Sequence, residues 1–359
     1  MITSEILNNV EQQEKLHFNR SLFESQIDRH AEAALSHFKQ ITRHFALFHF
    51  SFMAIAFVEL FAFILFFSFL TKSTVLAFSL AAILLTGFSY FVLLFYLQAK
   101  KPEQLLHVRH NFIKASQSAL PLEKGTPEYH LSLAHALHHL VAKLQNQEYT
   151  YYALPPSFQT LGPLMEKLSV WIHWQDLHQM KEILLLLIVR EQVEMVKIQP
   201  TDLQAHASLA NAHIALSKLY CDPRKIYPEK NFVWVSPEYS SEEMQQKFRK
   251  CSERAIEEFK ILDQFAPNDP WVHAQLAGVF HELEMPFEEM QEYETILKIS
   301  PADHEVLFRL GALYFQQGLI AKGLQAYEKL KAAKELKAGE LISYYDAYLS
   351  EEYEEPETT

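Results

Sequence analysis

The chain contains little glycine and little cysteine, and both scarcities narrow what it can be. Its 359 residues include eight glycines and two cysteines, Cys221 and Cys251. So few glycines argue against glycine-rich phosphate loops and against all-β architectures with many tight turns. Two cysteines provide neither a disulfide framework nor a Cys-x-x-Cys metal pair, and they suit a reducing compartment.

The chain also has fewer basic than acidic residues, with 32 lysines and arginines against 44 aspartates and glutamates. The formal net charge of −12 leads us to expect no nucleic-acid partner. The chain also lacks a serine–histidine–acid order, a Walker motif, a dinucleotide fingerprint and a kinase signature. We therefore expect no enzyme activity and no cofactor.

Apolar sequence, by contrast, is abundant near the N-terminus. Residues 45–97 are nearly all apolar, and Thr71–Thr74 is the one clear break. The two blocks, Phe45–Leu70 and Val75–Leu97, each exceed the roughly 20 apolar residues that a helix needs to cross the hydrocarbon core. Because four residues connect them, they must be antiparallel, and a transmembrane hairpin is predicted over 45–98. The alternative is a hairpin buried in a soluble core, but the second block has no charged residue and is apolar around its whole circumference.

Basic residues flank the hairpin on its outer sides. They are Arg29, Lys39 and Arg43 before it and Lys100, Lys101, Arg109 and Lys114 after it, whereas the turn offers only Lys72. This bias predicts that both termini face the cytoplasm or an equivalent compartment, and a bacterial inner membrane is the expected location. The first span begins too deep for a cleaved signal peptide, so we expect an uncleaved anchor.

Residues 1–44 are expected to form an amphipathic helix that leads into the first span. Its apolar positions recur at spacings of seven, four and three, and they are Leu16, Phe23, Ile27, Ala31, Ala34, Phe38 and Ile41. Such a stripe buries one helix face against another helix. We favour packing within the chain over pairing with a second copy or contact with the lipid surface.

A regular spacing of prolines organises the C-terminal half. Pro200, Pro267 and Pro301 each end a helical stretch. The interval from Pro267 to Pro301 matches the helix–turn–helix period of about 34 residues that is typical of tetratricopeptide repeats. The interval from Pro200 to Pro267 is about twice that period, which corresponds to one repeat unit plus an insertion of nearly the same length.

The residues within this period resemble the tetratricopeptide family. Those at the family's leucine, small-residue and aromatic positions are Leu209, Ala210, Ala255, Phe259, Leu276, Ala277, Phe280, Tyr293, Leu310, Gly311, Tyr314 and Tyr327. Glu289 and Ile296 depart from the pattern, because the family has small residues there. The resemblance implies an all-α protein with a repeat solenoid over 99–350, in which small residues let helices approach closely.

Other segments of this region are also expected to be helical. They are roughly 127–146, 164–178, 181–198 and a capping helix over 338–349, followed by a disordered acidic tail over 351–359. Two aromatic, proline-containing segments, 147–159 and 221–239, interrupt the helices. These segments either carry function on one face of the repeats or fill an irregular interface. The second ends in a predicted capping box, Ser240-x-x-Glu243.

The tetratricopeptide resemblance also implies a concave groove that binds a peptide. Positions that would face it are Asn211, Trp271, Ala274, Gly278, His281, Glu305, Phe308, Ala312 and Phe315. One subgroup of the family clamps a C-terminal carboxylate, and Asn211, Gln275 and Arg309 match its clamp. Because Ala207 and Glu305 replace the two lysines of that clamp, we expect an apolar peptide or helix instead. Alternatively, Phe308 and Phe315 pack against the capping helix.

Three histidines, His135, His138 and His139, fall on one helix at spacings that suit two metal ligands. No third ligand accompanies them, so a solvated or packing face is the favoured interpretation and no metal is expected.

Glu59 falls near the middle of the first span, and His49 lies near its entrance. Carboxylates inside a membrane are costly and are often functional. We favour a protonated Glu59 that bonds to a hydroxyl of the facing helix, at Ser79, Thr86 or Ser89.

The leading hypothesis is a membrane-anchored tetratricopeptide adaptor that binds a protein partner on the cytoplasmic side. A second hypothesis follows from the hairpin, which is similar over residues 45–97 to the inclusion-membrane proteins secreted by chlamydial bacteria. That resemblance implies a protein that faces host cytosol. A third hypothesis is a transporter or channel subunit that uses Glu59.

Overall fold

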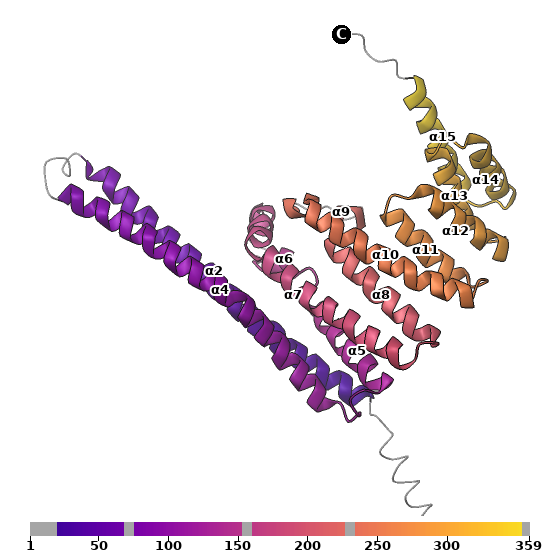
Figure 1. The fold of residues 1–359 in the computed structure, drawn as a ribbon. Helices are drawn as coiled ribbons and strands as arrows, with labels where there is room; N and C mark the ends of the chain where they lie inside the picture. The colour runs from indigo at the N-terminus through magenta and orange to yellow at the C-terminus, as the bar shows by residue number, and fades with distance from the viewer. Residues whose placement is uncertain (1–19, 68–74, 153–159, 227–233, 354–359) are drawn as a thin grey trace, which may run out of the picture. The chain divides into compact units, whose positions relative to one another are not determined.

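The computed structural model describes residues 20–67, 75–152, 160–226 and 234–353 (Figure 1). Regular secondary structure in these ranges is helical and includes no strand, which confirms the predicted all-α class. The chain divides into two compact units. Unit 1 comprises Met1–Ile198 with Asp222–Glu238, and unit 2 comprises Gln199–Cys221 with Tyr239–Thr359. The sequence predicted one repeat domain over 99–350, whereas this division groups the helices before Gln199 with the hairpin.

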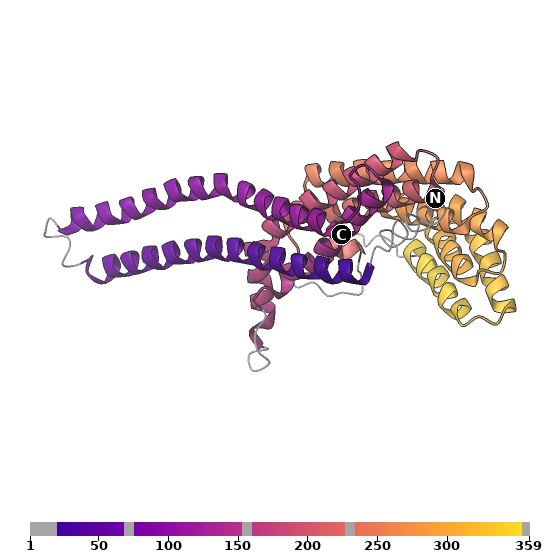
Figure 2. The ribbon, with the colours of Figure 1, turned by 90° about the horizontal axis from the view of Figure 1, so that it is seen from below.

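Unit 1 is built on two long helices, α2 (Arg20–Leu65) and α4 (Val75–Ala119), which pack side by side (Figure 2). The predicted N-terminal helix and first span form one helix, because no glycine or proline interrupts α2. Helix α4 runs well past the predicted end of the second span at Leu97 and contains Pro102. The predicted turn, Thr71–Thr74, lies outside the described residues.

The hairpin has a packed part and an exposed part. The apolar stripe of α2 is buried from Phe23 to Phe45, where the helix contacts α4 and α5 (Pro127–Leu144), as predicted. Leu16 lies outside the described residues. Beyond Ala46 the large apolar side chains are exposed, among them Phe50, Met53, Phe57, Val58, Phe61, Ile64, Phe78, Leu84, Leu85, Phe88, Phe91 and Phe95.

The remaining helices of unit 1 cover the packed part. Helix α5 begins where the sequence predicted, because the Thr126 hydroxyl accepts a hydrogen bond from the backbone N–H of Tyr129. It packs on α7 (Gly162–Ile198), and the short helix α6 (Gln147–Thr150) packs on α7 as well. The sequence predicted two helices over 164–198, but nothing between them breaks a helix, and α7 is continuous.

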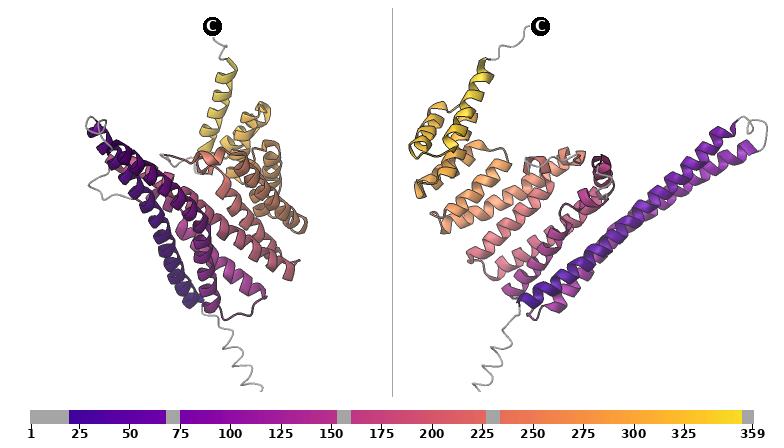
Figure 3. Two further views of the ribbon diagram at one scale, coloured as in Figure 1. Left: turned by 60° about the vertical axis from the view of Figure 1, so that its left-hand side comes forward. Right: turned by 180° about the vertical axis from the view of Figure 1, so that it is seen from behind.

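Unit 2 is a row of helices in which each helix contacts the next (Figure 3). They are α8 (Leu203–Tyr220), α10 (Glu242–Phe265), α11 (Pro270–Glu282), α12 (Pro286–Ile299), α13 (His304–Gln316), α14 (Ile320–Ala332) and α15 (Lys337–Tyr353). Between α8 and α10 the chain forms α9 (Pro223–Ile226) and the 3-10 helix η2 (Pro237–Ser240). Helices end at Ile198, Phe265 and Ile299, just before the three prolines that predicted these ends.

Small residues allow close helix contacts in unit 2. Ala210 packs in a buried cluster between α8, α10 and α11, and Ala277 packs in the next cluster along the chain. At Gly311 a methyl group would lie 2.7 Å from a methyl carbon of Leu341 and 3.1 Å from Ala326. The close approach predicted for these three small residues is therefore present.

Two predicted boundaries were wrong. The residue that caps α10 is Ser241 rather than Ser240, since its hydroxyl accepts from the backbone N–H of Met244 and the helix begins at Glu242. The last helix reaches Tyr353 and so includes the first residues of the predicted tail, 351–359. The rest of that tail lies outside the described residues.

A histidine at the start of α8 and another at the start of α11 make the same contacts in equivalent positions. His206 contacts Glu258 through Nδ1 at 2.6 Å and the carbonyl oxygen of Pro200 through Nε2 at 3.0 Å. His273 contacts Glu292 at 2.7 Å and the carbonyl oxygen of Pro267 at 3.1 Å. Because the carboxylates and carbonyls only accept, both nitrogens of each ring donate and each ring is positively charged. Each histidine thus ties the proline-containing turn before its own helix to a later helix of unit 2, α10 for His206 and α12 for His273.

These contacts predict how the stability of unit 2 depends on pH. Burial lowers the pKa of His206 and His273, but the bonds to glutamate and carbonyl oxygens outweigh it, so both pKa values are raised. The stabilisation is therefore complete below the ordinary histidine pKa of about 6.5 and is lost as pH rises through the folded-state pKa.

The measurement is denaturant unfolding of the full chain between pH 6 and pH 9, followed by fluorescence of Trp271, with the other three tryptophans changed to phenylalanine. We expect the free energy of unfolding to fall as pH rises. The double variant His206→Gln/His273→Gln should flatten this slope, leaving the contributions of His281, whose pKa the bond to Glu289 raises, and of His213, whose pKa burial lowers. An unchanged slope in the double variant would contradict the assignment.

Candidate functional site

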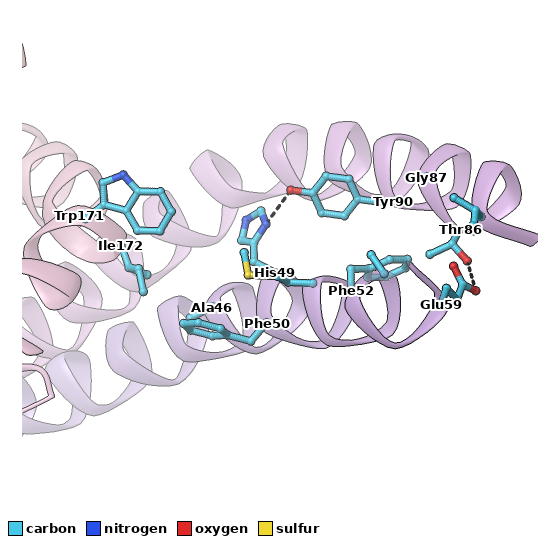
Figure 4. Close-up of a pocket in the computed structure, with 13 residues that line it drawn as sticks. Ala46, His49, Phe50, Phe52, Glu59, Thr86, Gly87, Tyr90, Trp171 and Ile172 are labelled. Atoms are coloured by element: carbon cyan, nitrogen blue, oxygen red, sulfur yellow. Dashed lines mark hydrogen bonds between the residues drawn. The ribbon is translucent and has the colours of Figure 1, made fainter. Parts of the chain in front are cut away.

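A cleft of about 680 Å³ lies between the two hairpin helices and the start of α7 (Figure 4). Its lining from α2 includes Ala46, His49, Phe50, Phe52, Met53, Ala56 and Glu59, and its lining from α4 includes Ile83, Thr86, Gly87 and Tyr90. Helix α7 contributes Trp171 and Ile172. The missing side chain at Gly87 leaves space, since a methyl group there would meet no atom within 4 Å.

Two hydrogen bonds cross this cleft between α2 and α4. The Thr86 hydroxyl donates to Oε1 of Glu59 at 2.8 Å, and Nδ1 of His49 shares a hydrogen bond of 3.1 Å with the Tyr90 hydroxyl (Figure 4). The predicted bond from a facing hydroxyl to Glu59 is thus present, at Thr86. The other carboxylate oxygen, Oε2, is buried and has no hydrogen-bond partner among the described residues. Glu59 therefore joins α2 to α4 through Oε1, while Oε2 receives no hydrogen bond from the described residues.

The first aromatic segment fills the base of unit 1. The Tyr151 hydroxyl donates to the carbonyl oxygen of Lys39 at 2.8 Å and lies 2.6 Å from the hydroxyl of Thr42. The Tyr151 ring stacks on His173 at 3.8 Å between centroids, and Tyr152 shares a hydrogen bond of 2.9 Å with His173. For these two tyrosines, the interface-filling alternative is the one that the structure shows. Residues 153–159 lie outside the described residues.

A buried ion pair lies beside these rings. Lys101, at the end of the apolar part of α4, pairs with Asp176 of α7, and its Nζ also lies 4.9 Å from the ring centroid of Phe45. Burial raises the pKa of Asp176 against the opposing effect of Lys101. Burial, with a contribution from the Lys101 cation, lowers the pKa of His173 to about 4, so this imidazole is neutral at pH 7.

The predicted groove residues differ in exposure from one helix to another. On α11, Trp271, Ala274, Gly278 and His281 are exposed along one face, and Asn211 is exposed on α8. His281 shares a hydrogen bond of 3.1 Å with Glu289. This α11 face, defined by those four residues, is therefore open to a partner.

On α13 the prediction was wrong in part. Phe315 is fully buried beneath Gly323 and Tyr345, and Ala312 is buried with it. Phe308 is half-buried against Tyr344 and the Lys337 ammonium. The capping helix α15 covers this end of α13, as the alternative interpretation held, because α13 turns an apolar face to it.

Polar residues of α13 are engaged as well. Glu305 pairs with Lys337 of α15 and with Arg309, whose Nε lies 3.3 Å away. Arg309 matched the carboxylate clamp in the sequence, but here it already has an acidic partner. The structure therefore supplies no free clamp on this helix.

The three histidines of α5 do not converge. Nε2 of His139 lies at hydrogen-bond distance, 3.0 Å, from Oδ1 of Asp28 on α2, and His135 and His138 are exposed. Among the residues that the structure describes, no group of three histidine, cysteine, aspartate or glutamate side chains is placed to hold a metal ion.

Comparison with known proteins gives no relative. A scan against models of known protein families and a search of curated proteins both found no match to this chain. The tetratricopeptide resemblance therefore stays a prediction, and function is argued from the geometry.

Sequence reasoning missed three contributors to the cleft and its base: Tyr90, Trp171 and Asp176. Tyr90 could have been identified from the sequence, because its hydroxyl lies within the apolar Val75–Leu97 block; in the structure it faces His49 across the hairpin. Trp171 and Asp176 could not, because their roles depend on how α7 packs against α2 and α4.

The buried pair predicts a large effect from a single substitution. Lys101→Met leaves Asp176 buried without a cation, and such changes cost about 3–5 kcal/mol in the free energy of unfolding. Adding Asp176→Asn removes the buried charge and should restore most of the loss.

The matched control is Lys143→Met, since Lys143 pairs at 2.7 Å with Asp28, whose side chain is 43% exposed against 5% for that of Asp176. That variant should cost no more than about 1 kcal/mol. Unfolding of the full chain in mixed micelles, driven by a denaturing detergent, gives each value. Equal losses at Lys101 and Lys143 would contradict the structural argument.

Proposed function

We propose that this protein is a membrane-anchored scaffold: the hairpin inserts into a bilayer, and unit 2 binds a protein partner through the α11 face. The observation that carries the proposal is the exposure of the apolar hairpin. The most apolar window of each of the helices Phe23–Leu65 and Val75–Ala119 contains no buried residue. A core helix of a soluble protein would bury such a window, whereas a lipid-facing helix leaves it exposed.

The lengths of these helices support partial insertion. They have 43 and 45 residues, and at 1.5 Å per residue each is about 65 Å long. A hydrocarbon core is about 30 Å thick. About half of each helix therefore suffices to span it, which agrees with the exposed part, while the packed part extends into water with α5 and α7.

Unit 2 supports the binding role through what it leaves exposed. Trp271 is 42% exposed, although its ring contacts Phe259 at 5.9 Å between centroids. Part of the ring is therefore packed against Phe259, and the remainder is exposed to solvent. Around it lie two small residues, Ala274 and Gly278, that let a partner helix or strand approach the backbone of α11. A held aromatic ring among small neighbours suits an apolar anchor of a bound peptide.

Topology can be tested by cysteine labelling. In a chain with Cys221 and Cys251 changed to serine, we expect Ser73→Cys in the turn to react with a membrane-impermeant maleimide added outside intact bacterial cells. Lys124→Cys, at an exposed position after α4, should react only once the cells are permeabilised. This result follows because basic residues retain the flanks of the hairpin in the cytoplasm. Labelling of both positions from outside would contradict the proposed orientation.

The α11 face can be tested by photo-crosslinking in cells that express the full chain. A benzophenone side chain at Ala274 should give discrete protein adducts, and Trp271→Ala should weaken them by about 30-fold in apparent affinity, as expected for an aromatic anchor. The control position is Gln325, which is exposed on α14. Adducts of equal yield at both positions would show that the α11 face is not selective.

A further inference from the structure

A second pocket, polar and basic, lies on α2 where the helix leaves the packed part of unit 1. Its volume is about 600 Å³. One side of α2 lines it with Ser36, Lys39, Gln40, Arg43 and His44, and Tyr151 forms a wall. Leu47 closes the end that leads to the exposed part of the hairpin. The pocket therefore joins cationic side chains to the apolar surface that we propose to be in lipid.

The cations in this pocket are not paired with any acidic side chain that the structure describes. Within the described part of the chain, no carboxylate forms an ion pair with Lys39 or Arg43, and Lys39 lies 6.0 Å from the ring centroid of Tyr151. By contrast, two more deeply placed lysines of unit 1 have acidic partners, Lys101 in Asp176 and Lys181 in Glu148 at 2.9 Å. Two uncompensated cations on adjacent turns attract an anion.

The basic face is held in a fixed orientation. Phe38, Ile41 and Phe45 are buried on the opposite side of α2, so the helix cannot rotate. The Tyr151 hydroxyl, bonded to the Lys39 carbonyl oxygen, holds the tyrosine wall against the same turn. The pocket is thus preorganised, which lowers the entropy cost of binding.

The depth of the pocket matches the phosphate layer of a bilayer. Leu47 is the first exposed apolar residue of the hairpin, and Arg43 precedes it by four residues, or about 6 Å along a helix. The head-group region on each side of the hydrocarbon core is roughly 5–8 Å thick. Arg43 and His44 therefore lie at the level of the phosphates. The flexible Lys39 side chain can extend to the phosphates from one helical turn below.

We propose that this pocket binds the phosphate of an anionic phospholipid, whose acyl chains then run along Leu47 and Phe50. The inference rests on the proposed insertion of the hairpin. A guanidinium fork matches phosphate oxygens, and Arg43 supplies it, with Lys39 as a second cation. The apolar surface that continues from the pocket distinguishes a lipid from a free anion, because only a lipid would cover it.

The test uses full-length protein in vesicles of phosphatidylcholine with or without phosphatidylglycerol, after which native mass spectrometry counts the lipids retained by the extracted protein. Protease protection of the hairpin in the same vesicles reports insertion. We expect phosphatidylglycerol to be retained in preference to phosphatidylcholine. Lys39→Gln/Arg43→Gln should reduce that preference roughly 25-fold, at about fivefold for each basic side chain near the surface.

The control variant is Lys114→Gln/Lys124→Gln, which removes the same charge from exposed positions away from the pocket and should keep the preference. The exchanged variant Lys39→Arg/Arg43→Lys keeps both charges and should keep most of it, which shows that the first variant did not act by unfolding α2. Inorganic phosphate at millimolar concentration should not displace the lipid.

Several outcomes would overturn the inference. They are an inserted protein with no lipid preference, an equal loss in the control variant, or displacement by inorganic phosphate, which would make the pocket a site for a free anion. A hairpin that remains open to protease would overturn the proposed function together with this inference, so the two failures are distinguishable.

Discussion

Among the described residues, most of the apolar surface of the outer hairpin is left exposed, and this constrains where the polar groups of unit 1 lie. Beyond Ala46 of α2, Trp171 and Ile172 of α7 border the start of this surface, and many phenylalanines and leucines farther out point outward. In water such a surface would carry a free-energy cost of about 25 cal/mol for each Å² left exposed. A bilayer removes that cost, and it also fixes where polar groups must begin. The change occurs within about two turns, from exposed Leu47 to the buried Thr42 and Phe38 that face the packed helices.

Three polar side chains inside or beside this apolar region contact a polar group on another helix. Glu59 takes a hydrogen bond from Thr86, His49 shares one with Tyr90, and Lys101 pairs with Asp176. Each contact joins two different helices, so each fixes the position of one helix against another as well as satisfying a polar group. The Lys101–Asp176 pair is the most consequential, because it joins α4 to α7 at the base of the apolar region. The stacked rings of Tyr151 and His173 lie near this pair.

The sequence predicted the helices, the hairpin and the apolar stripe because these follow from local patterns. The stripe from Phe23 to Ile41 has the helical period, and every described member is buried. Helix ends before Pro200, Pro267 and Pro301 follow from the restriction that proline places on the residue before it. A hydroxyl bond to Glu59 was also predicted, with Thr86 as one of three candidates, because a carboxylate in an apolar hairpin has few possible partners. Long-range packing was not predictable in the same way. Nothing local distinguishes Asp176 or Trp171 from ordinary residues of an amphipathic helix, and their roles arise only when α7 meets the hairpin.

In unit 2, the burial of Phe315 likewise depends on long-range packing that a local pattern does not settle. It also affects which helix surfaces remain exposed. The repeat position of Phe315 corresponds to that of His281, and Phe315 shares a helix face with Phe308 two turns before it, so a repeat pattern places these residues on one groove. The pattern does not include α15, which packs its tyrosines on α13 and buries Phe315 completely. The ion pair of Lys337 with Glu305 holds the start of α15 against α13. A ligand that reached this face of α13 would have to displace α15, whereas Trp271 on α11 is 42% exposed. Under the proposed function, the last helix therefore leaves α11 as the candidate surface, because this apolar face of α13 is packed within the chain.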